Sequence, residues 1–293
     1  MYGGSFSTQD GITDSGMISG AGTIGGPLGG TGTVYAEGGT LDLTGTVASG
    51  LTFQIYGDLK IDGTATMANS LGLTDPNQTL EIGPSGSLTI TAVESDHEGT
   101  FKLDGGTLTD AQGFKQGSTI TIAGFGTING TEDGLIYQGP VVEATGGTLT
   151  LNGDIYVGNI IPEIAAGATF SLLGAIEEYQ LVGAPAGSER FTFLSSASGT
   201  LELGTATARE SFETNGVIGN MNVSTNGAPT NVLDLADVQP SSITSAMVAN
   251  GNTIELFNGA TMIDHFALAS SVGTAAVHWG SDGGSGSNIF LSV

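Results

Sequence analysis

Short runs in which an apolar residue alternates with a polar one recur along most of the chain, and glycines separate them. The plainest run is LTL at 149–151, and the runs LDL at 41–43 and LTI at 88–90 repeat it. A period of two is typical of strands that bury one face. The leucines and isoleucines of these runs are therefore predicted to point into a core, with the threonines and aspartate facing out.

The spacing of these runs is close to constant. Glycines open successive units at Gly106, Gly126, Gly147 and Gly167, a period of about 20 residues. One such unit is too short to bury its apolar residues, whereas a stack of units buries them and pairs their backbones. We therefore predict an all-β fold of the β-solenoid class. The favoured form is a right-handed parallel β-helix with about 20 residues per coil; a β-sandwich is the structural alternative.

Three regions differ in character. Residues 1–31 are rich in glycine and form a predicted lead-in or connector, residues 32–205 carry the periodic solenoid body, and residues 206–293 form a predicted β-rich cap or assembly module. Helical patterns are nearly absent because glycine interrupts them. The best helical candidate is Ser241–Asn250, which follows Pro240 and ends before Gly251.

Composition narrows the classes of partner. The chain has 293 residues, with 29 acidic and 5 basic residues, so its formal net charge is −24. Nucleic acids and anionic membranes would be repelled, because their phosphates need lysine and arginine. No run approaches ~18 consecutive apolar residues, so no membrane insertion is expected. The chain has no cysteine, which excludes disulfides and thiolate chemistry.

The motifs for bound cofactors are weak. The stretch GAGTIG at 20–25 matches a dinucleotide-binding fingerprint, but the glycine-rich residues after it cannot form the helix that this site needs. No cofactor is therefore expected, apart from calcium ions on the acidic surface. The candidate calcium ligands are acidic residues in loops, for which plain solvation is the default interpretation: Asp96, Glu98, Glu132, Asp133 and Asp282.

Two parts of the chain resemble known families. The GGTLxLxG units, such as GGTLDLTG at 38–45, resemble the passenger regions of bacterial autotransporters and haemagglutinin-type adhesins, which form β-helices. The segments VLDLADV (232–238), 251–269 and 276–293 are similar to the module that closes large secreted surface proteins of alphaproteobacteria. The present HWGSDGGSGSN departs from the usual pattern of that module. The resemblance implies secretion to the bacterial cell surface, with type I secretion as the implied route.

The expected role is structural or adhesive rather than enzymatic. Lyases of acidic sugars need clustered arginine or lysine, whereas the five basic residues are dispersed in the sequence. We expect self-association into a homopolymer, such as a filament or biofilm matrix, in which residues 1–31 or the first coil of one copy pair with the C-terminal module of the next.

Two alternatives stay open. One is a monomeric module that binds a glycan or another cell-surface partner through aligned tyrosines, for which the candidates are Tyr56, Tyr137, Tyr156 and Tyr179. The other is a hydrolase of neutral polysaccharides that uses two carboxyl groups.

Overall fold

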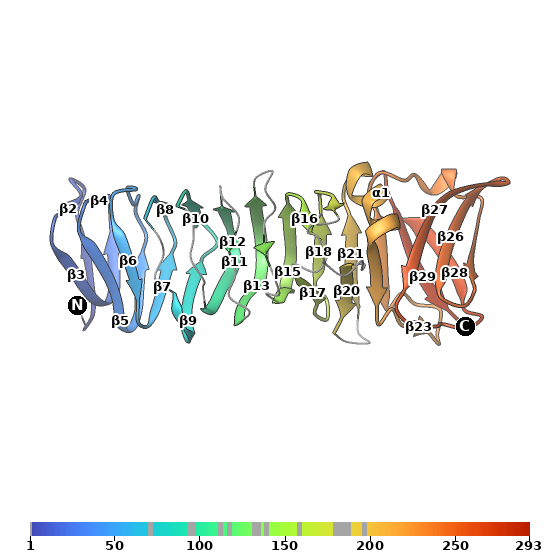
Figure 1. Cartoon of the computed structure of the whole chain (residues 1–293), viewed down its shortest axis with the longest axis horizontal. Helices are drawn as coiled ribbons and strands as arrows, with labels where there is room; N and C mark the ends of the chain where they lie inside the picture. The colour runs from blue at the N-terminus through green and yellow to red at the C-terminus, as the bar shows by residue number, and fades with distance from the viewer. Residues whose placement is uncertain are drawn as a thin grey trace, which may run out of the picture. The chain divides into compact units, whose positions relative to one another are not determined.

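The structure is a computed structural model of the chain. It describes residues 2–69, 73–92, 98–110, 114–115, 119–130, 136–137, 141–156, 160–177, 189–194 and 198–293. Strands predominate among these residues, which confirms the all-β class, and the same residues contain one α-helix. The chain divides into two compact units, Met1–Val142 and Glu143–Val293. In each unit most strands belong to a large, mostly parallel sheet (Figure 1).

Unit 1 consists of strands that range from 2 to 13 residues in length. They are β1 (Tyr2–Ser7), β2 (Ile12–Asp14), β3 (Met17–Gly25), β4 (Leu28–Gly30), β5 (Thr33–Leu43), β6 (Thr52–Ile55), β7 (Asp58–Ile61), β8 (Thr64–Met67), β9 (Thr74–Ile82), β10 (Ser87–Ile90), β11 (Glu98–Asp110), β12 (Phe114–Lys115), β13 (Thr119–Gly130) and β14 (Ile136–Tyr137). Successive strands pair in parallel: β1 with β3, β3 with β5, β5 with β7, β7 with β9, β9 with β11 and β11 with β13. Asp58, for example, pairs with Thr40 of β5 on one side and with Thr79 of β9 on the other.

In this parallel register, apolar side chains of successive strands stack on one another. One column of the core passes from strand to strand through Leu41, Leu59, Leu80, Phe101 and Ile122. Each of these side chains is at most 1% exposed. Leu88 and Ile90 of β10 are also fully buried. The predicted inward positions of unit 1 are therefore confirmed, and the alternation of the sequence is the cause, because every second side chain of a strand points to the same face.

Close stacking explains one glycine in β13. Gly124 lies in register with Leu103 of β11 and has a φ of +128°. A Cβ atom at this position would overlap the carbonyl oxygen of Leu103. Only glycine allows both this backbone conformation and this approach.

Unit 2 begins as a similar stack and then changes. Its elements are β15 (Val141–Asn152), which starts at the unit border, β16 (Ile155–Tyr156), β17 (Ile161–Ile164), β18 (Thr169–Leu172), β19 (Ile176–Glu177), β20 (Glu189–Phe193), β21 (Gly199–Leu203), α1 (Ala206–Asn215), β22 (Gly216–Gly219), β23 (Val223–Ser224), β24 (Asn231–Leu235), the 3₁₀ turn η1 (Pro240–Ser242), β25 (Ser245–Ala249), β26 (Thr253–Asn258), β27 (Thr261–Leu268), β28 (Ala276–Ser281) and β29 (Ser287–Ser292).

The spacing between partners increases in unit 2. Thr169 pairs with Thr148 on one side and with Thr200 on the other, and the stretch of chain to Thr200 is the longer of the two. Unit 2 has a core column of its own, which passes from strand to strand through buried side chains, namely Leu149, Phe170, Leu201, Leu233 and Ile289. Leu149 and its neighbour Leu151 therefore point inward as predicted.

Antiparallel strands end the parallel stack of unit 2. Strand β24 pairs antiparallel with β29, and β29 with β28. Strand β22 pairs with β27, which is joined antiparallel to β26, and β26 to β25. The last strands of the parallel stack are thus covered by two hairpin systems (Figure 1).

The helical prediction at Ser241–Asn250 is wrong. A 3₁₀ turn forms at Pro240–Ser242, but Ser245–Ala249 is strand β25 and pairs residue by residue with β26. A short isolated helix is marginal without a buried face, and pairing with β26 satisfies the backbone instead. The helix that does form, α1, was missed. Its signal is Thr205, whose side chain accepts a hydrogen bond from the N–H of Ala208 at 3.0 Å and so caps the helix.

Candidate functional site

Strand β1 presents an uncharged edge at the end of unit 1. Its sequence, YGGSFS, contains no charged residue and no proline. Its residue pairings run to β3 only within the described chain. Natural edge strands are commonly protected by charges, prolines or covering segments. Strand β1 lacks the first two of these devices.

The core is also open at β1. Phe6 lies in register with Ile24 of β3, in the inward column, and Ile24 is in register with Leu43 of β5 on its other side. Ile24 is 2% exposed, whereas Phe6 is 52% exposed. Ile24 is covered by a strand on each side, whereas no described strand covers Phe6. The large apolar side chain of Phe6 is therefore exposed at the end of the core.

The backbone of β1 offers hydrogen bonds on its open side. The N–H of Thr8, just after the strand, donates to the carbonyl oxygen of Gly25 at 3.3 Å. In a parallel pair, alternate residues direct their N–H and C=O groups to opposite neighbours. The N–H and C=O groups of Ser5 and Ser7 therefore face away from β3.

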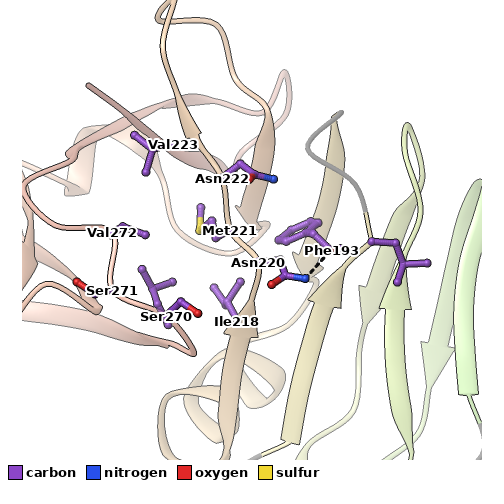
Figure 2. Close-up of a pocket in the computed structure, with 11 residues that line it drawn as sticks. Phe193, Ile218, Asn220, Met221, Asn222, Val223, Ser270, Ser271 and Val272 are labelled. Carbon is purple, nitrogen blue, oxygen red and sulfur yellow. Dashed lines mark hydrogen bonds between the residues drawn. The ribbon is translucent and has the colours of Figure 1, made fainter.

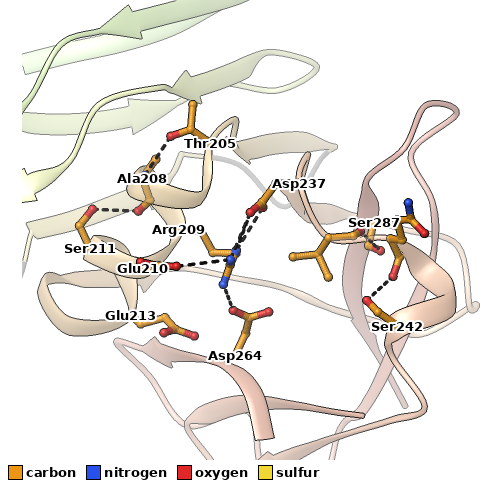
Figure 3. A network of polar contacts seen from close by, with 12 residues as sticks. Thr205, Ala208, Arg209, Glu210, Ser211, Glu213, Asp237, Ser242, Asp264 and Ser287 are labelled. Atoms are coloured by element: carbon orange, nitrogen blue, oxygen red, sulfur yellow. Dashed lines mark hydrogen bonds and ion pairs between the residues drawn. The ribbon is translucent and has the colours of Figure 1, made fainter.

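A polar cluster joins α1 to the antiparallel strands of unit 2 (Figure 3). The guanidinium of Arg209 on α1 contacts Asp237 through Nε at 3.1 Å and forms an ion pair with Asp264 of β27. Glu213, one helical turn later, accepts a hydrogen bond from the backbone N–H of His265 at 2.9 Å. The helix is thus tied to β27 at two points.

The VLDLADV segment (232–238) supplies one arm of this cluster. Asp237 binds Arg209, and the carbonyl oxygen of Val238 accepts a hydrogen bond from the hydroxyl of Ser287 at 2.6 Å. The turn after β24 is therefore connected both to α1 and to β29.

The cluster is suited to stabilise the fold rather than to catalyse a reaction. Burial raises the pKa of Asp264 to about 7; the guanidinium of Arg209 lowers it and the carboxyl of Glu213 raises it. A cavity of about 390 Å³ adjoins Arg209, Asp237 and Asp264. However, the Asp264 side chain is 2% exposed, and both aspartates are bound to Arg209. A general acid must reach its substrate with a free carboxyl group, which this arrangement does not provide.

A second cavity in unit 2 has an uncharged lining (Figure 2). Its volume is about 450 Å³, and its lining residues are Phe193, Leu194, Ile218, Asn220, Met221, Asn222, Val223, Leu268, Ser270, Ser271 and Val272. Asn220 has a positive φ of 56°, and its amide donates to the carbonyl oxygen of Phe193 at 3.2 Å. Because no titratable side chain lines this cavity, its lining provides no acid, base or charged metal ligand.

The parallel register of unit 1 also assembles a column of charges. Asp42, Lys60, Glu81 and Lys102 follow one another on successive strands. Glu81 lies between the two lysines, at 3.6 Å from Lys60 and 2.7 Å from Lys102. A hydrogen bond to Asp62 raises the pKa of Lys60, and one to Glu81 raises that of Lys102. The two lysines are dispersed in the sequence, but they recur at the spacing of the paired strands, so the register brings them to one column.

The candidate calcium ligands are only partly described. Asp96, Glu132 and Asp133 lie outside the described residues. Glu98 is exposed at the start of β11 in unit 1. The carboxylate of Asp282, in the β28–β29 turn of unit 2, accepts hydrogen bonds from the N–H groups of Gly284 at 2.6 Å and Gly286 at 3.2 Å. Calcium binding stays a prediction.

The described residues contain no group of three or more acidic or histidine side chains arranged to hold a metal ion.

One predicted tyrosine is on the surface of unit 1. Tyr56 is 61% exposed, and its ring stacks on that of Tyr35 at 6.0 Å between centroids. Tyr156 is half-buried. Tyr179 and the side chain of Tyr137 lie outside the described residues.

No protein-family model matches the chain, and no curated protein matches it either. Among the described residues, no helix has the length and apolar character needed to cross a membrane.

Proposed function

We propose that this chain is a secreted structural or adhesive subunit that associates end to end into a filament or matrix at the bacterial cell surface. In this proposal the parallel strands form a β-solenoid, with a right-handed parallel β-helix as its favoured form. Support comes from Asp58, which pairs with Thr40 on one side and with Thr79 on the other. Each of these partners lies one predicted coil of about 20 residues from Asp58 along the chain. The antiparallel strands of unit 2 are the proposed cap. The role is non-enzymatic.

The observation that carries the proposal is the open end of the core at β1. Phe6 is 52% exposed directly over Ile24, which is 2% exposed. A further strand placed on β1 would bury Phe6 and pair the outward N–H and C=O groups of Ser5 and Ser7. At ~25 cal/mol per Å² of apolar surface buried, covering the side chain of Phe6 would supply a sizeable part of the free energy of association.

The distribution of charge supports end-to-end contact. All five basic residues and 24 of the 29 acidic residues lie between positions 37 and 238. The first 36 residues contain only Asp10 and Asp14, and residues 239–293 contain only three acids. Two copies of a chain with net charge −24 repel each other, and the repulsion is least where surfaces carry few charges. Contacts between the first and last strands meet this condition.

The resemblance to adhesin passengers and to the closing module of secreted surface proteins supports the location. Both kinds of protein work outside the cell. The VLDLADV segment that carries the second resemblance lies at the start of the proposed cap, where Asp237 and Val238 bind α1 and β29.

A second candidate function is glycan binding by unit 1. The exposed ring of Tyr56 on Tyr35 is the observation that favours it, because sugars stack on exposed aromatic faces. Binding on a glycan array that is lost in Tyr56→Ala, with filaments absent at every concentration, would favour this function over the structural one.

Negative-stain electron microscopy of the purified chain tests the structural proposal. Uniform filaments whose abundance rises with protein concentration are expected. Images with calcium and after chelation show whether metal ions contribute to the contacts. Single particles at all concentrations, in both conditions, would contradict the proposal.

A further inference from the structure

The antiparallel strands of unit 2 carry an apolar patch beside β25. Within the described chain, the residue pairings of β25 run to β26 only. We use the name apolar patch for Met247, Phe257 and Met262. Met247 and Met262 are 49% and 48% exposed, and Phe257 lies in register with Met262 on the neighbouring strand.

A small cavity opens next to this patch. Its volume is about 330 Å³, and its lining includes Met247, Phe257 and Ala260 without any charged side chain. This volume is at the lower end of the ~300–1,000 Å³ that is typical of ligand pockets. It suits one large side chain better than an extended ligand.

Strands β1 and β25 are matched in length and charge. Strand β1 has six residues and β25 has five, and neither contains a charge or a proline. Glu255 of β26 lies in register with Met247 on one side and with His265 on the other, so one acidic residue borders the apolar surface of Met247 and Phe257. Addition of a strand to an edge derives its affinity from backbone hydrogen bonds and its specificity from pockets for side chains.

We propose that the apolar patch and strand β25 receive strand β1 of a second copy of this chain, with Phe6 of that copy in the cavity of about 330 Å³. This inference rests on the proposed end-to-end association and assigns its acceptor surface. The contact is heterologous, because the surface on one copy differs from that on the other, and such a contact continues into a filament when it does not close into a ring.

Strand β28 is the competing acceptor, because its residue pairings run to β29 only within the described chain. Its side chains are already engaged, however. The ring of His278 stacks on Phe290 at 5.1 Å between centroids, and its Nε2 atom lies 2.7 Å from the hydroxyl oxygen of Ser292. At β25, by contrast, apolar side chains are exposed and lie next to a cavity.

Disulfide trapping tests the assignment. The chain has no cysteine, so a bond between two single-cysteine variants can form only between copies. Phe6→Cys, carrying a size tag, is mixed under oxidising conditions with Met247→Cys, His278→Cys or Ile161→Cys. Ile161 is the control, because it is 45% exposed on strand β17, away from the antiparallel strands. A disulfide requires Cα atoms within about 7 Å.

We expect the mixed dimer of Phe6→Cys with Met247→Cys to exceed the Ile161→Cys control by about tenfold. A larger yield with His278→Cys than with Met247→Cys would overturn the acceptor and leave end-to-end association intact. Yields equal to the control, with filaments of the unchanged chain visible by electron microscopy, would also overturn it. Yields equal to the control, with no filaments of the unchanged chain, would contradict the proposed function as well.

Discussion

Arg209 and Asp264 form an ion pair between helix α1 and strand β27, and both side chains are largely buried, at 14% and 2% exposure. They are 55 residues apart in the sequence. Asp237 completes the cluster by accepting hydrogen bonds from Nε and Nη2 of the same guanidinium. The pair therefore fixes the antiparallel strands of unit 2 to the helix that precedes them.

Arg209→Ala is expected to destabilise the chain by about 3–5 kcal/mol, because it leaves the buried carboxyl of Asp264 without its partner. Urea unfolding followed by circular dichroism measures this change. Arg190→Ala, which removes an exposed arginine of β20, is the control and should stay within about 0.5 kcal/mol of the unchanged chain. In the double variant Arg209→Met/Asp264→Leu most of the loss should disappear, and equal losses in the single and double variants would contradict the ion-pair account.

The chain is expected to be more stable in mild acid than at neutral pH. Burial raises the pKa of Asp264 to about 7 and that of Asp234 to about 6, the latter with further contributions from Asp282 and Glu202. Both carboxyls bind a proton more tightly in the folded state than in the unfolded state, where their pKa is near 3.8. By linkage, their contribution to the free energy of unfolding is full below about pH 4 and is lost as the pH rises to about 7.

Thermal unfolding at pH 5, 6 and 7.5 checks this direction. The midpoint of thermal unfolding should fall with rising pH, and the midpoint of the Asp234→Asn variant should fall by less over the same interval. A midpoint that rises from pH 5 to pH 7.5 would contradict the inferred pKa values.

Much of the fold follows from local pattern. The alternation at Leu41, Leu43, Leu149 and Leu151 predicts their burial, since the period of a strand is fixed by its backbone geometry. The regular spacing of the glycines predicts stacked parallel strands, because each repeat can bury its apolar face only against its neighbours. Helix α1 was missed because its support is tertiary: Phe212, buried in the core, packs between Phe191 at 5.2 Å and Phe266 at 6.3 Å, measured between ring centroids.

The Arg209 cluster and the exposure of Phe6 were harder to predict from the sequence. Arg209 meets Asp237 and Asp264 across 28 and 55 residues, and no local period relates these positions. The exposure of Phe6 follows from the absence of a described strand beyond β1, which alternation alone does not reveal. The association of residues 1–31 with the C-terminal module stays a prediction, and it named two regions of the chain without the side chain, Phe6, or the strand, β25, that we propose for the contact.

Glycines of the stack should differ in their tolerance of alanine according to their surroundings. Gly124→Ala is expected to be the most costly, at about 3 kcal/mol or more, because it combines a positive φ with a backbone oxygen that the new Cβ would overlap. Gly167→Ala has a positive φ of 72° but open space, and about 1 kcal/mol is expected. Gly280→Ala, in open space without a positive φ, is the neutral control. Denaturant unfolding of the three variants gives the order, and a tolerated Gly124→Ala would contradict the close stacking of β11 and β13.

The end-to-end account depends most directly on Phe6, and sedimentation velocity over a range of concentrations tests it with two lysine variants. Phe6→Lys places a charge at the open end of the core, and Ile161→Lys makes the same kind of change at a similarly exposed side chain, 45% against 52%, on β17. Burying an unpaired ammonium costs several kcal/mol, and each factor of ten in affinity corresponds to about 1.4 kcal/mol. Phe6→Lys should therefore raise the concentration needed for assembly at least tenfold, while Ile161→Lys should assemble like the unchanged chain. Equal assembly by the two variants, or an unchanged chain that stays monomeric throughout, would contradict the account.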